Sequence, residues 1–353
     1  MKCIDKTRTN VLKILPEICS NRKFLNCRRK IRKALLLVFA VASFSLTGCS
    51  EEISIENPYA VFSTAEKYEL PEEVDVPTIS FFAKDLCVAG TGDIKESGIT
   101  EGLSEAAGIF NTKELTVDYA KNIHEKLYPA STTKILTAYV ALKYGNMSDI
   151  ATVRAEALDL EEGSSVCGLA AGDQISLEEL LYGLMMSSGN DAANVIAELI
   201  SSNTESFAEL MNKEALALGA LNSHFVNAHG LHDEQHYTTL YDLYLIFQAA
   251  IQNETFVKLI HTATHTANFK NSSGEEVVKE WSTTNKYLSK AVPTPDGVTV
   301  IGGKTGTTNA AGHCLVLLSK NQDMAPYISI VLKSDGRDNL YLQMSELLEG
   351  ISK

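Results

Sequence analysis

The chain has 353 residues, of which 45% are hydrophobic and 21% are charged, so it can bury a full core in one large domain or two medium ones. This composition excludes a disordered or fibrous protein. The net charge of −13 conceals an asymmetry, because residues 1–48 hold 11 Lys and Arg against 2 Asp and Glu, which leaves 20 against 42 from Cys49 onward. The acidic body argues against nucleic acid as a partner, since a nucleic-acid backbone is itself anionic.

The first predicted element is a signal peptide over residues 1–48. A basic patch at residues 28–33 precedes an apolar run at residues 34–46, which is shorter than the roughly 20 residues that span a membrane. A transmembrane anchor is therefore the weaker alternative. Residues 46–49, Leu-Thr-Gly-Cys, resemble the lipobox of bacterial lipoproteins, in which the Cys thiol is acylated and becomes the mature N-terminus. The resemblance implies a lipid on Cys49 and an exported protein on the outer face of the bacterial cytoplasmic membrane, facing the cell wall.

The next stretch, residues 49–77, is interpreted as an acidic flexible tether, because it holds three prolines and little periodicity. Beyond it the chain has three cysteines, Cys87, Cys167 and Cys314. Their odd number and wide spacing give neither a disulfide framework nor a metal-binding pattern. We expect them to be small buried hydrophobic residues.

Strands are predicted at both ends of the remaining chain. Two apolar runs, residues 78–90 and 106–120, are predicted to be strands that the Gly-rich residues 91–102 connect flexibly. Residues 298–334 have the pattern of strand, turn, strand, turn, strand, and their short connections favour antiparallel pairing. A closing helix is expected over about residues 339–351, with four side chains facing inward: Leu340, Met344, Leu347 and Leu348.

Helices are predicted between these strands. Residues 128–142, YPASTTKILTAYVAL, predict a buried helix that Gly145 can end, with four side chains on its inward side: Ile135, Leu136, Tyr139 and Leu142. Residues 176–200 predict two more helices. Ser176 and Glu179 form a capping box at the first, and Asp191 is expected to cap the second after a break with the sequence SSGN.

The helix over residues 128–142 begins with Ser131 and Lys134 on one face. A Ser in the first turn lies where unpaired backbone N–H groups and the helix dipole stabilise developing negative charge. Because a serine hydroxyl is a poor nucleophile, it needs a base, and a Lys can serve if burial or a second cation keeps it partly neutral. The spacing alone is equally typical of a polar helix start with a lysine that reaches solvent.

Two later motifs favour catalysis. Ser188 and Asn190 lie in the break between two predicted helices. The Ser188 hydroxyl can relay a proton between Lys134, Ser131 and a leaving amine, and the Asn190 amide can accept from Lys134 and donate to a substrate carbonyl. Lys304, at the end of a predicted strand, supplies a positive charge for a substrate's terminal carboxylate and opposes protonation of Lys134.

The strand that carries Lys304 also suits a peptide substrate. Glycines at 302, 303 and 306 leave room for a peptide to pair along the strand edge. The backbone N–H groups of Ser131 and Thr307 are then expected to face the carbonyl oxygen as an oxyanion hole.

Four long segments carry a family resemblance: PASTTKILTA, SSGNDAANVIAE, MNKEALALGALNSHFVNAHGLHDEQHYTTLYDL and GGKTGTTNAAGHCLV. From about residue 105 to the C-terminus, the chain resembles the low-molecular-mass D-alanyl-D-alanine carboxypeptidases, serine peptidase family S11. The resemblance implies an α+β, β-lactamase/DD-peptidase-like fold, with a five-stranded antiparallel sheet flanked by helices and an all-helical part. It also implies removal of the terminal D-alanine from a peptidoglycan stem peptide through an acyl-enzyme, and acylation by penicillin.

Residue by residue, the resemblance implies that Ser131 is the nucleophile and Lys134 the general base. Ser188 and Asn190 would form the second motif, and the carboxylate would be clamped by Lys304, Thr305, Gly306 and Thr307. No cofactor or metal is implied. The implied partners are a stem peptide ending in D-Ala-D-Ala, β-lactam antibiotics as inhibitors, and the membrane through a lipid anchor.

The resemblance has two departures. Only 47 residues follow Gly306, so we expect a single catalytic domain over residues 78–353 without the β-rich C-terminal domain of many relatives. Residues 78–104 exceed the family's usual opening strand, and we interpret the excess as a plain loop rather than a lid or partner surface.

The sequence also allows three other interpretations. His229, His232 and His236 suggest a metal site, but a preceding Gly and polar neighbours favour a loop with hydrogen-bonding histidines. A class A-like β-lactamase needs a Glu and an Asn in a loop after the second motif, whereas Glu214 is followed at the matching offset by Leu218. A catalytically inactive wall-binding lipoprotein is the remaining alternative, and the three intact motifs argue against it.

Overall fold

The computed structural model describes residues 83–96, 98–100 and 102–352, which belong to one compact unit. The predicted signal peptide, the predicted lipid site at Cys49, the predicted tether and the predicted domain boundary at residue 78 lie outside these residues. In the described part of the chain, no helix has both the length and the apolar character needed to cross a membrane.

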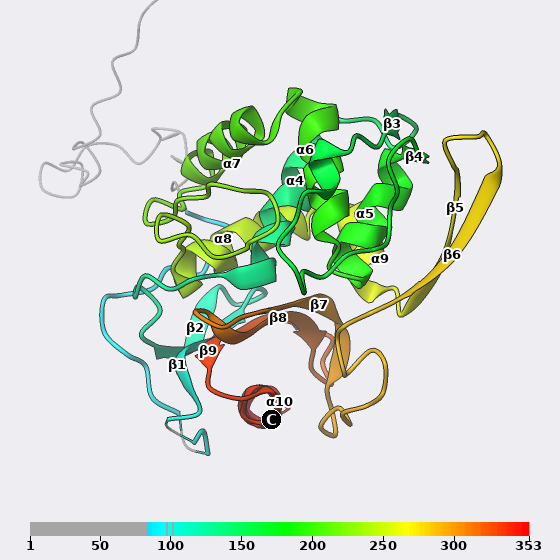
Figure 1. Cartoon of the computed structure of the whole chain (residues 1–353). Coiled ribbons are helices and arrows are strands. Elements are labelled where there is room, and N and C mark those ends of the chain that lie inside the picture. Colours follow the sequence, from blue (N-terminus) through cyan, green and yellow to red (C-terminus); the bar gives the residue numbers. More distant parts are fainter. Residues whose placement is uncertain (1–82, 97, 101, 353) are drawn as a thin grey trace, which may run out of the picture. The chain divides into compact units, whose positions relative to one another are not determined.

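The central layer is a five-stranded antiparallel sheet with the strand order β2-β1-β9-β8-β7, which confirms the predicted sheet (Figure 1). The N-terminal hairpin pairs with the last strand, so that Ile109 of β1 lies opposite Ser329 of β9. The three C-terminal strands follow one another through short turns, as predicted. The strands are β1 (Ser104–Asn111), β2 (Thr116–Lys121), β7 (Thr299–Thr308), β8 (Gly312–Lys320) and β9 (Pro326–Ser334).

Neighbouring side chains of each strand face opposite layers, because the side-chain period of a strand is two residues. Ile109 and Val331 pack into a core shared with helix α10 (Arg337–Gly350), whereas Phe110 and Ile330 pack into the core shared with the other helices. Figure 1 shows α10 below the sheet and the other helices above it. The inward face predicted for the closing helix is confirmed, since all four side chains are buried: Leu340, Met344, Leu347 and Leu348.

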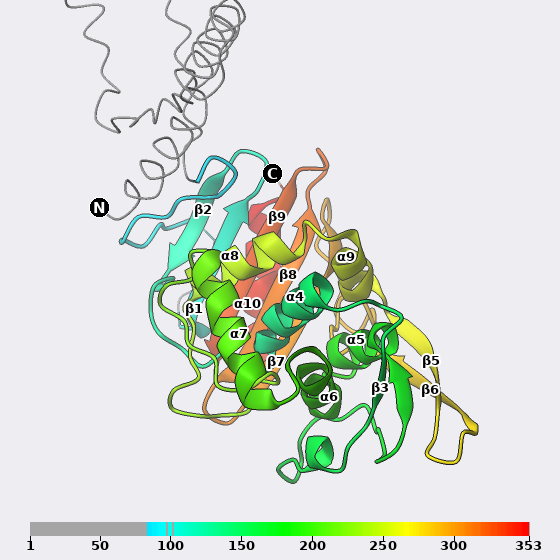
Figure 2. The same cartoon turned by 90° about the horizontal axis from the view of Figure 1, so that it is seen from above.

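The helical layer surrounds α4 (Lys134–Tyr144), which carries the first motif (Figure 2). The predicted helix and its end at Gly145 are confirmed. Its burial is less one-sided than predicted, because Tyr139 and Leu142 are only partly buried while Thr137 is fully buried. The reason is that other helices contact α4 on several sides: α5 (Leu177–Met186), α6 (Asn190–Ser201), α7 (Thr204–Ala217), α8 (Leu240–Ala250) and α9 (Glu254–His261).

A second, four-stranded antiparallel sheet with the order β3-β4-β5-β6 was not predicted. Two of its strands have only three residues, and the hairpin of β5 and β6 alternates mostly exposed polar residues, so no apolar pattern marks them. Trp281 at its base is buried and donates from Nε1 to the carbonyl of Cys167 (3.0 Å). The strands are β3 (Ile150–Thr152), β4 (Gln174–Ser176), β5 (Thr264–Lys270) and β6 (Glu276–Ser282).

The two N-terminal strand predictions were partly wrong. The second run is a hairpin rather than one strand, because the Asn111 side chain accepts from the backbone N–H groups of Lys113 and Glu114 and turns the chain. The described part of the first run, residues 83–90, holds no strand. Its backbone groups bond to side chains of α8 instead: Cys87 donates its N–H to the Tyr244 hydroxyl (2.8 Å) and accepts from the Tyr241 hydroxyl (2.9 Å).

Residues 87–96 and 98–100 form a strap across the edge of the sheet, which refines the interpretation of this region as a plain loop. From α8 the strap reaches β2, where Ile94 makes a two-bond bridge to Ala120. It then reaches α10, where the backbone N–H and hydroxyl of Thr100 both donate to the Glu346 carboxylate (2.8 and 2.7 Å). The strap therefore covers part of the exposed edge of β2, an edge that otherwise invites pairing with other chains.

Candidate active site

Ser131 lies in a short 3₁₀ turn, Ala130–Thr133, that leads directly into α4. The turn is held by Thr132, whose hydroxyl donates to the carbonyl of Pro129 (2.6 Å). Strand β7 approaches the turn closely, since a Cβ added at Gly306 would lie 2.9 Å from the amide nitrogen of Ser131. Only glycine allows the strand and the turn to come this near.

Lys134 is the first residue of α4, and its side chain is fully buried. Its Nζ donates to Ser131 Oγ (3.0 Å), Asn190 Oδ1 (2.7 Å) and the carbonyl of His229 (2.7 Å). Burial, and next the nearby charge of Lys304, lower the pKa of Lys134 well below its usual value. An amine with a lowered pKa, one hydrogen bond from a serine hydroxyl, meets the requirements of a general base.

Ser188 and Asn190 lie where α5 ends and α6 begins, as predicted. Asn190 accepts from Lys134, which agrees with its predicted role. The Ser188 hydroxyl accepts from Lys304 Nζ (2.8 Å), and none of its described hydrogen bonds is with Lys134, so its role as a proton relay stays a prediction. Ser188 also has a positive φ of 56°, a costly backbone conformation for a residue other than glycine that often marks a functional position.

Lys304 lies on β7 beneath the cleft, with 1% of its surface exposed. Its Nζ donates to Ser188 Oγ and to the carbonyl of Thr305, both at 2.8 Å. Burial lowers the pKa of Lys304 to about 7. Lys304 and Lys134 are therefore two neighbouring buried amines, and each proton that one holds opposes protonation of the other.

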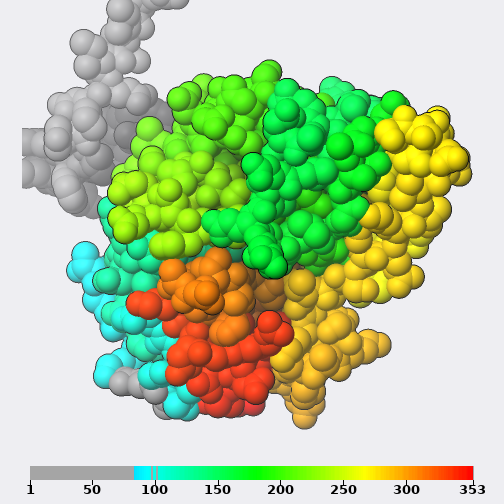
Figure 3. Space-filling model, viewed as in Figure 1, coloured from blue at the N-terminus to red at the C-terminus, as the bar shows by residue number. Residues whose placement is uncertain are grey.

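A cleft of about 380 Å³ opens in front of these groups. It is lined by Ser131 and Ser188 from the helical part and by Thr305, Gly306 and Thr307 from β7. Figure 3 shows the green helical part meeting the orange and red strand part along a seam on one face of the molecule. The three separate motifs thus meet at one cleft, although Lys134 and Lys304 lie behind its wall.

The cleft also contains residues that the sequence did not indicate. Arg337, at the start of α10, and Lys286, from the loop after β6, bring positive charge, and His313 and Ser165 contribute polar atoms. None of the described lining residues is a carboxylate. A single Arg or Lys belongs to no sequence motif that would mark it as a cleft residue. Arg337 also precedes the predicted start of the closing helix at residue 339. The position of these two cations therefore becomes evident only in the folded chain.

Asp191 was expected to cap α6, and this prediction was wrong. The cap position is Gly189, and the helix begins at Asn190. The Asp191 carboxylate instead accepts from three consecutive backbone N–H groups of a neighbouring loop, with distances of 2.9 to 3.1 Å, and from Ala192 N–H (2.9 Å). Because the carboxylate is 2% exposed, these bonds fix the loop that carries Ser165 against the second motif. The loop residues are Cys167, Gly168 and Leu169.

The loop histidines have structural contacts, as predicted. Val226 N–H donates to His236 Nδ1 (3.2 Å), so the opposite nitrogen, Nε2, donates to the Thr133 hydroxyl (2.8 Å) next to Lys134. Burial lowers the pKa of His236 to about 4, which keeps this tautomer neutral. Within residues that the structure describes, no three His, Cys, Asp or Glu side chains are grouped to hold a metal ion. The three predicted small cysteines are buried and unpaired: Cys87, Cys167 and Cys314.

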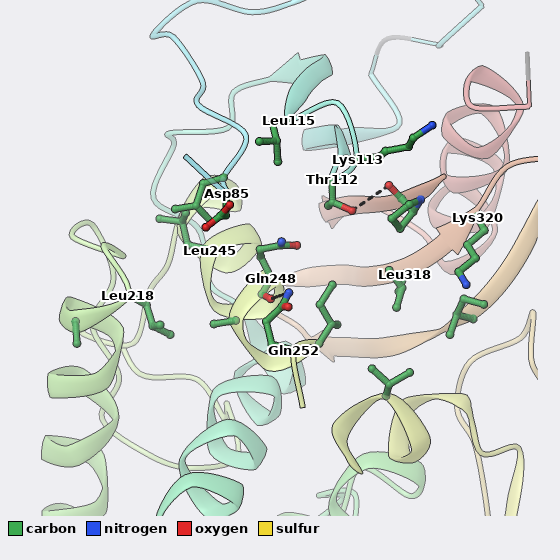
Figure 4. Close-up of a pocket in the computed structure, with 17 residues that line it drawn as sticks. Asp85, Thr112, Lys113, Leu115, Leu218, Leu245, Gln248, Gln252, Leu318 and Lys320 are labelled. Carbon is green, nitrogen blue, oxygen red and sulfur yellow. Dashed lines mark hydrogen bonds between the residues drawn. The ribbon is translucent and has the colours of Figure 1, made fainter. Parts of the chain in front are cut away.

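A larger cavity of about 1000 Å³ lies at the opposite ends of β7 and β8 (Figure 4). Its lining is mainly aliphatic, with Lys113, Lys320 and Asp85 among its polar members. None of the predicted site residues lines it. The pair of Ser131 and Lys134 is therefore associated with the smaller cleft, which Ser131 lines.

Comparisons with known proteins agree with this geometry. A family model described as D-alanyl-D-alanine carboxypeptidase matches residues 103–336. The chain is 32% identical over 234 residues to D-alanyl-D-alanine carboxypeptidase DacF of Bacillus subtilis, covering 65% of this chain and 57% of that protein. It is 34% identical over 244 residues to D-alanyl-D-alanine carboxypeptidase DacC of Escherichia coli, covering 65% and 58%. The chain thus spans less than two thirds of the length of these two relatives.

A solved structure gives the fold comparison. The DD-transpeptidase of Streptomyces K15 superposes with a TM-score of 0.66 and 29% sequence identity, covering 72% of this chain and 98% of that one. The sheet, the helical part and the cleft between them therefore have the arrangement of a DD-peptidase fold.

Proposed function

The chain belongs to the D-alanyl-D-alanine carboxypeptidase family, and from this premise we propose that it removes the terminal D-alanine from peptidoglycan stem peptides through an acyl-enzyme on Ser131. We also propose that penicillin acylates the same hydroxyl. One observation carries the proposal: Ser131 Oγ lies 3.0 Å from the Nζ of Lys134, a buried amine whose pKa is lowered.

The proposed reaction follows from these contacts. Neutral Lys134 takes the hydroxyl proton as Ser131 Oγ attacks the carbonyl carbon of the penultimate D-alanine. The C–N bond then breaks, and Lys134 gives the proton that it took from Ser131 to the leaving amine of D-alanine. The Ser188 hydroxyl, which lines the cleft and accepts from Lys304, can accept a hydrogen bond from the departing amine. Water next attacks the ester that remains on Ser131. Because no carboxylate is among the described cleft residues, we assign Lys134 as the base for this second step as well.

Recognition of the substrate's terminal carboxylate is assigned to the positively charged end of the cleft. Thr305 and Thr307 offer hydroxyls there, as the sequence predicted. Arg337 is exposed, and its side chain makes no ion pair or hydrogen bond with any described residue, so its guanidinium is available to a carboxylate. Lys304 adds positive charge from beneath the cleft. Because its Nζ donates to the Ser188 hydroxyl, we assign Lys304 a second role, which is to orient that hydroxyl.

The position of Glu214 argues against a class A-like β-lactamase. Its carboxylate accepts from Lys143 Nζ and the Tyr144 hydroxyl, both at 2.5 Å, at the far end of α4. Nine residues of helix separate Lys143 from Lys134, which is about 14 Å along the axis. From there Glu214 cannot activate water at an ester on Ser131. The inactive alternative is opposed by the complete set of contacts around Lys134.

The proposed function predicts two results for the wild-type chain. A peptide ending in D-Ala-D-Ala should release free D-alanine, and benzylpenicillin should add its full mass to the peptide that contains Ser131 and remain there for long times. Measurement of released D-alanine and mass spectrometry of the digested protein check both. Rapid penicillin turnover without D-alanine release would favour the β-lactamase, and neither reaction would favour the inactive protein.

We further propose that the protein is exported and anchored in the membrane by a lipid on Cys49, because a basic and an apolar segment precede Leu-Thr-Gly-Cys. A labelled fatty acid should be incorporated into the wild-type chain and lost in Cys49→Ala. Cys87→Ala is the matched control, since Cys87 is buried in the folded body and should leave the label unchanged. Equal labelling of wild type and Cys49→Ala would refute the anchor.

A further inference from the structure

His313 and Thr307 are direct cross-strand partners on β8 and β7, and both line the cleft. Their side chains share one hydrogen bond, between Thr307 Oγ1 and His313 Nδ1 (3.0 Å). Arg337, whose guanidinium is assigned to the substrate carboxylate, lines the same cleft. Its positive charge lowers the pKa of His313. The proposed function uses Thr307 and Arg337 but gives no role to the imidazole between them.

We propose that His313 is a positioning residue: it sets the direction of the Thr307 hydroxyl proton and thereby the affinity of the cleft for a substrate carboxylate. This inference rests on the proposed function. It adds His313 as a residue that favours substrates with a terminal carboxylate.

The reason is that a hydroxyl has one proton to donate. When His313 Nδ1 is unprotonated, it accepts that proton, and Thr307 turns its lone pairs to the cleft, where they repel a carboxylate. When Nδ1 carries a proton, it donates to Thr307 Oγ1, and the Thr307 proton becomes available to the carboxylate. The other ring nitrogen, Nε2, has no hydrogen-bond partner among the described residues. No described contact therefore fixes which of the two nitrogens carries the proton.

Protonation of the ring strengthens the same effect, because an imidazolium must donate from Nδ1. The charged groups that act on His313 are Arg337 on α10 and Asp335 before α10, and Lys286 lines the same cleft. Burial is the larger cause that lowers the pKa of His313, and the positive charge of Arg337 is the next. The negative charge of Asp335 raises this pKa. A bound carboxylate favours the imidazolium, so carboxylate affinity should rise as the pH falls below the ordinary histidine value of about 6.5.

The test compares two esters that form the same acyl-enzyme: an acyl-D-alanyl-D-lactate, which has the terminal carboxylate, and the matching acyl-D-alanine ethyl ester, which lacks it. The ratio of their kcat/KM values, measured from about pH 5 to pH 8, cancels effects on Ser131 and Lys134 that both esters share. In the wild type the ratio should rise toward acidic pH. In His313→Phe that rise below pH 6.5 should vanish, and the ratio should fall about tenfold at acidic pH, as expected for a lost bond to a charged group.

Three further variants make the outcome decisive. Thr307→Val should lower the ratio, and the double variant with His313→Phe should lower it no further, because His313 acts through Thr307. His261→Phe is the matched control, since its ring also makes one hydrogen bond, to the Ile301 carbonyl (2.6 Å), at the far end of β7. It should keep the wild-type ratio and pH dependence. A step near pH 7 that survives in His313→Phe would belong to Lys304, whose pKa is about 7.

The inference is overturned if His313→Phe keeps the wild-type ratio, if both esters slow equally, or if the effects of His313→Phe and Thr307→Val simply add. Failure of the proposed function is a separate result, because then neither ester would acylate the wild-type protein.

Discussion

Ser131→Ala is expected to abolish acylation by both penicillin and D-Ala-D-Ala peptides, with a loss of about 10⁴-fold or more. The substitution removes the oxygen that forms the ester and leaves the turn intact, because Thr132 holds that turn through Pro129. The Ser131 hydroxyl bonds to Lys134 and to no other described group, so few native contacts are lost. Stopped-flow measurement of penicillin acylation and release of D-alanine check the expectation.

The matched control for this variant is Ser206→Ala, which removes another serine from the first turn of a helix, in exposed α7. It should retain the wild-type rates. If Ser131→Ala formed the penicillin adduct at the wild-type rate, another group would have to be the nucleophile, and the assignment of the cleft would fail.

Lys134→Met is expected to slow acylation by about 10³-fold while leaving the chain folded, since loss of a general base typically costs 10² to 10⁴. Methionine has a similar length and no charge, so it fits the buried position, although Asn190 Oδ1 and the His229 carbonyl lose a donor. Lys143→Met is the control, because it removes a lysine from the same helix whose partner, Glu214, lies away from the cleft. Acylation rates within about threefold of wild type are expected for it, as for other changes remote from the chemistry.

The same base gives a pH dependence whose sign can be worked out. Neutral Lys134 is the reactive form, so the acylation rate should rise with pH through the lowered pKa of Lys134. The nearby charge of Lys304 helps to lower that pKa, so in Lys304→Gln the pKa should rise and the ascending limb should move to higher pH. If the ascending limb lay at the same pH in the wild type and in Lys304→Gln, the two amines would not interact. A Lys134→Met enzyme with the wild-type acylation rate would exclude Lys134 as the base.

Contacts between residues close together in the chain were predictable from the sequence, whereas contacts between distant residues were not. Ser131 and Lys134 are three residues apart, so one helical turn is enough to place a hydroxyl beside an amine, and the pattern alone predicted the contact. The N-cap at Ser176, whose hydroxyl accepts from Glu179 N–H (3.3 Å), was also predicted, whereas the reciprocal bond of the predicted capping box is replaced by contacts of the Glu179 carboxylate with His265 and Asn268. The three strands β7, β8 and β9 and their short turns were predicted from local patterns as well. The Asp191 cap failed because its local pattern was right and a distant loop offered better donors.

The sequence by itself determined that the Ser131 hydroxyl and the Lys134 amine lie side by side, and it determined the strand that carries Lys304, because spacing along a regular backbone sets which side chains lie on one face. The tertiary structure alone decided that Lys304 bonds to Ser188, 116 positions away, and that Arg337 and His313 line the cleft. It also decided the chemistry of Lys134, since the pKa of Lys134 is lowered by removal from water and next by the charge of Lys304, and both depend on elements far away in the chain. Burial and Coulomb interactions depend on distances in space, which no local pattern encodes.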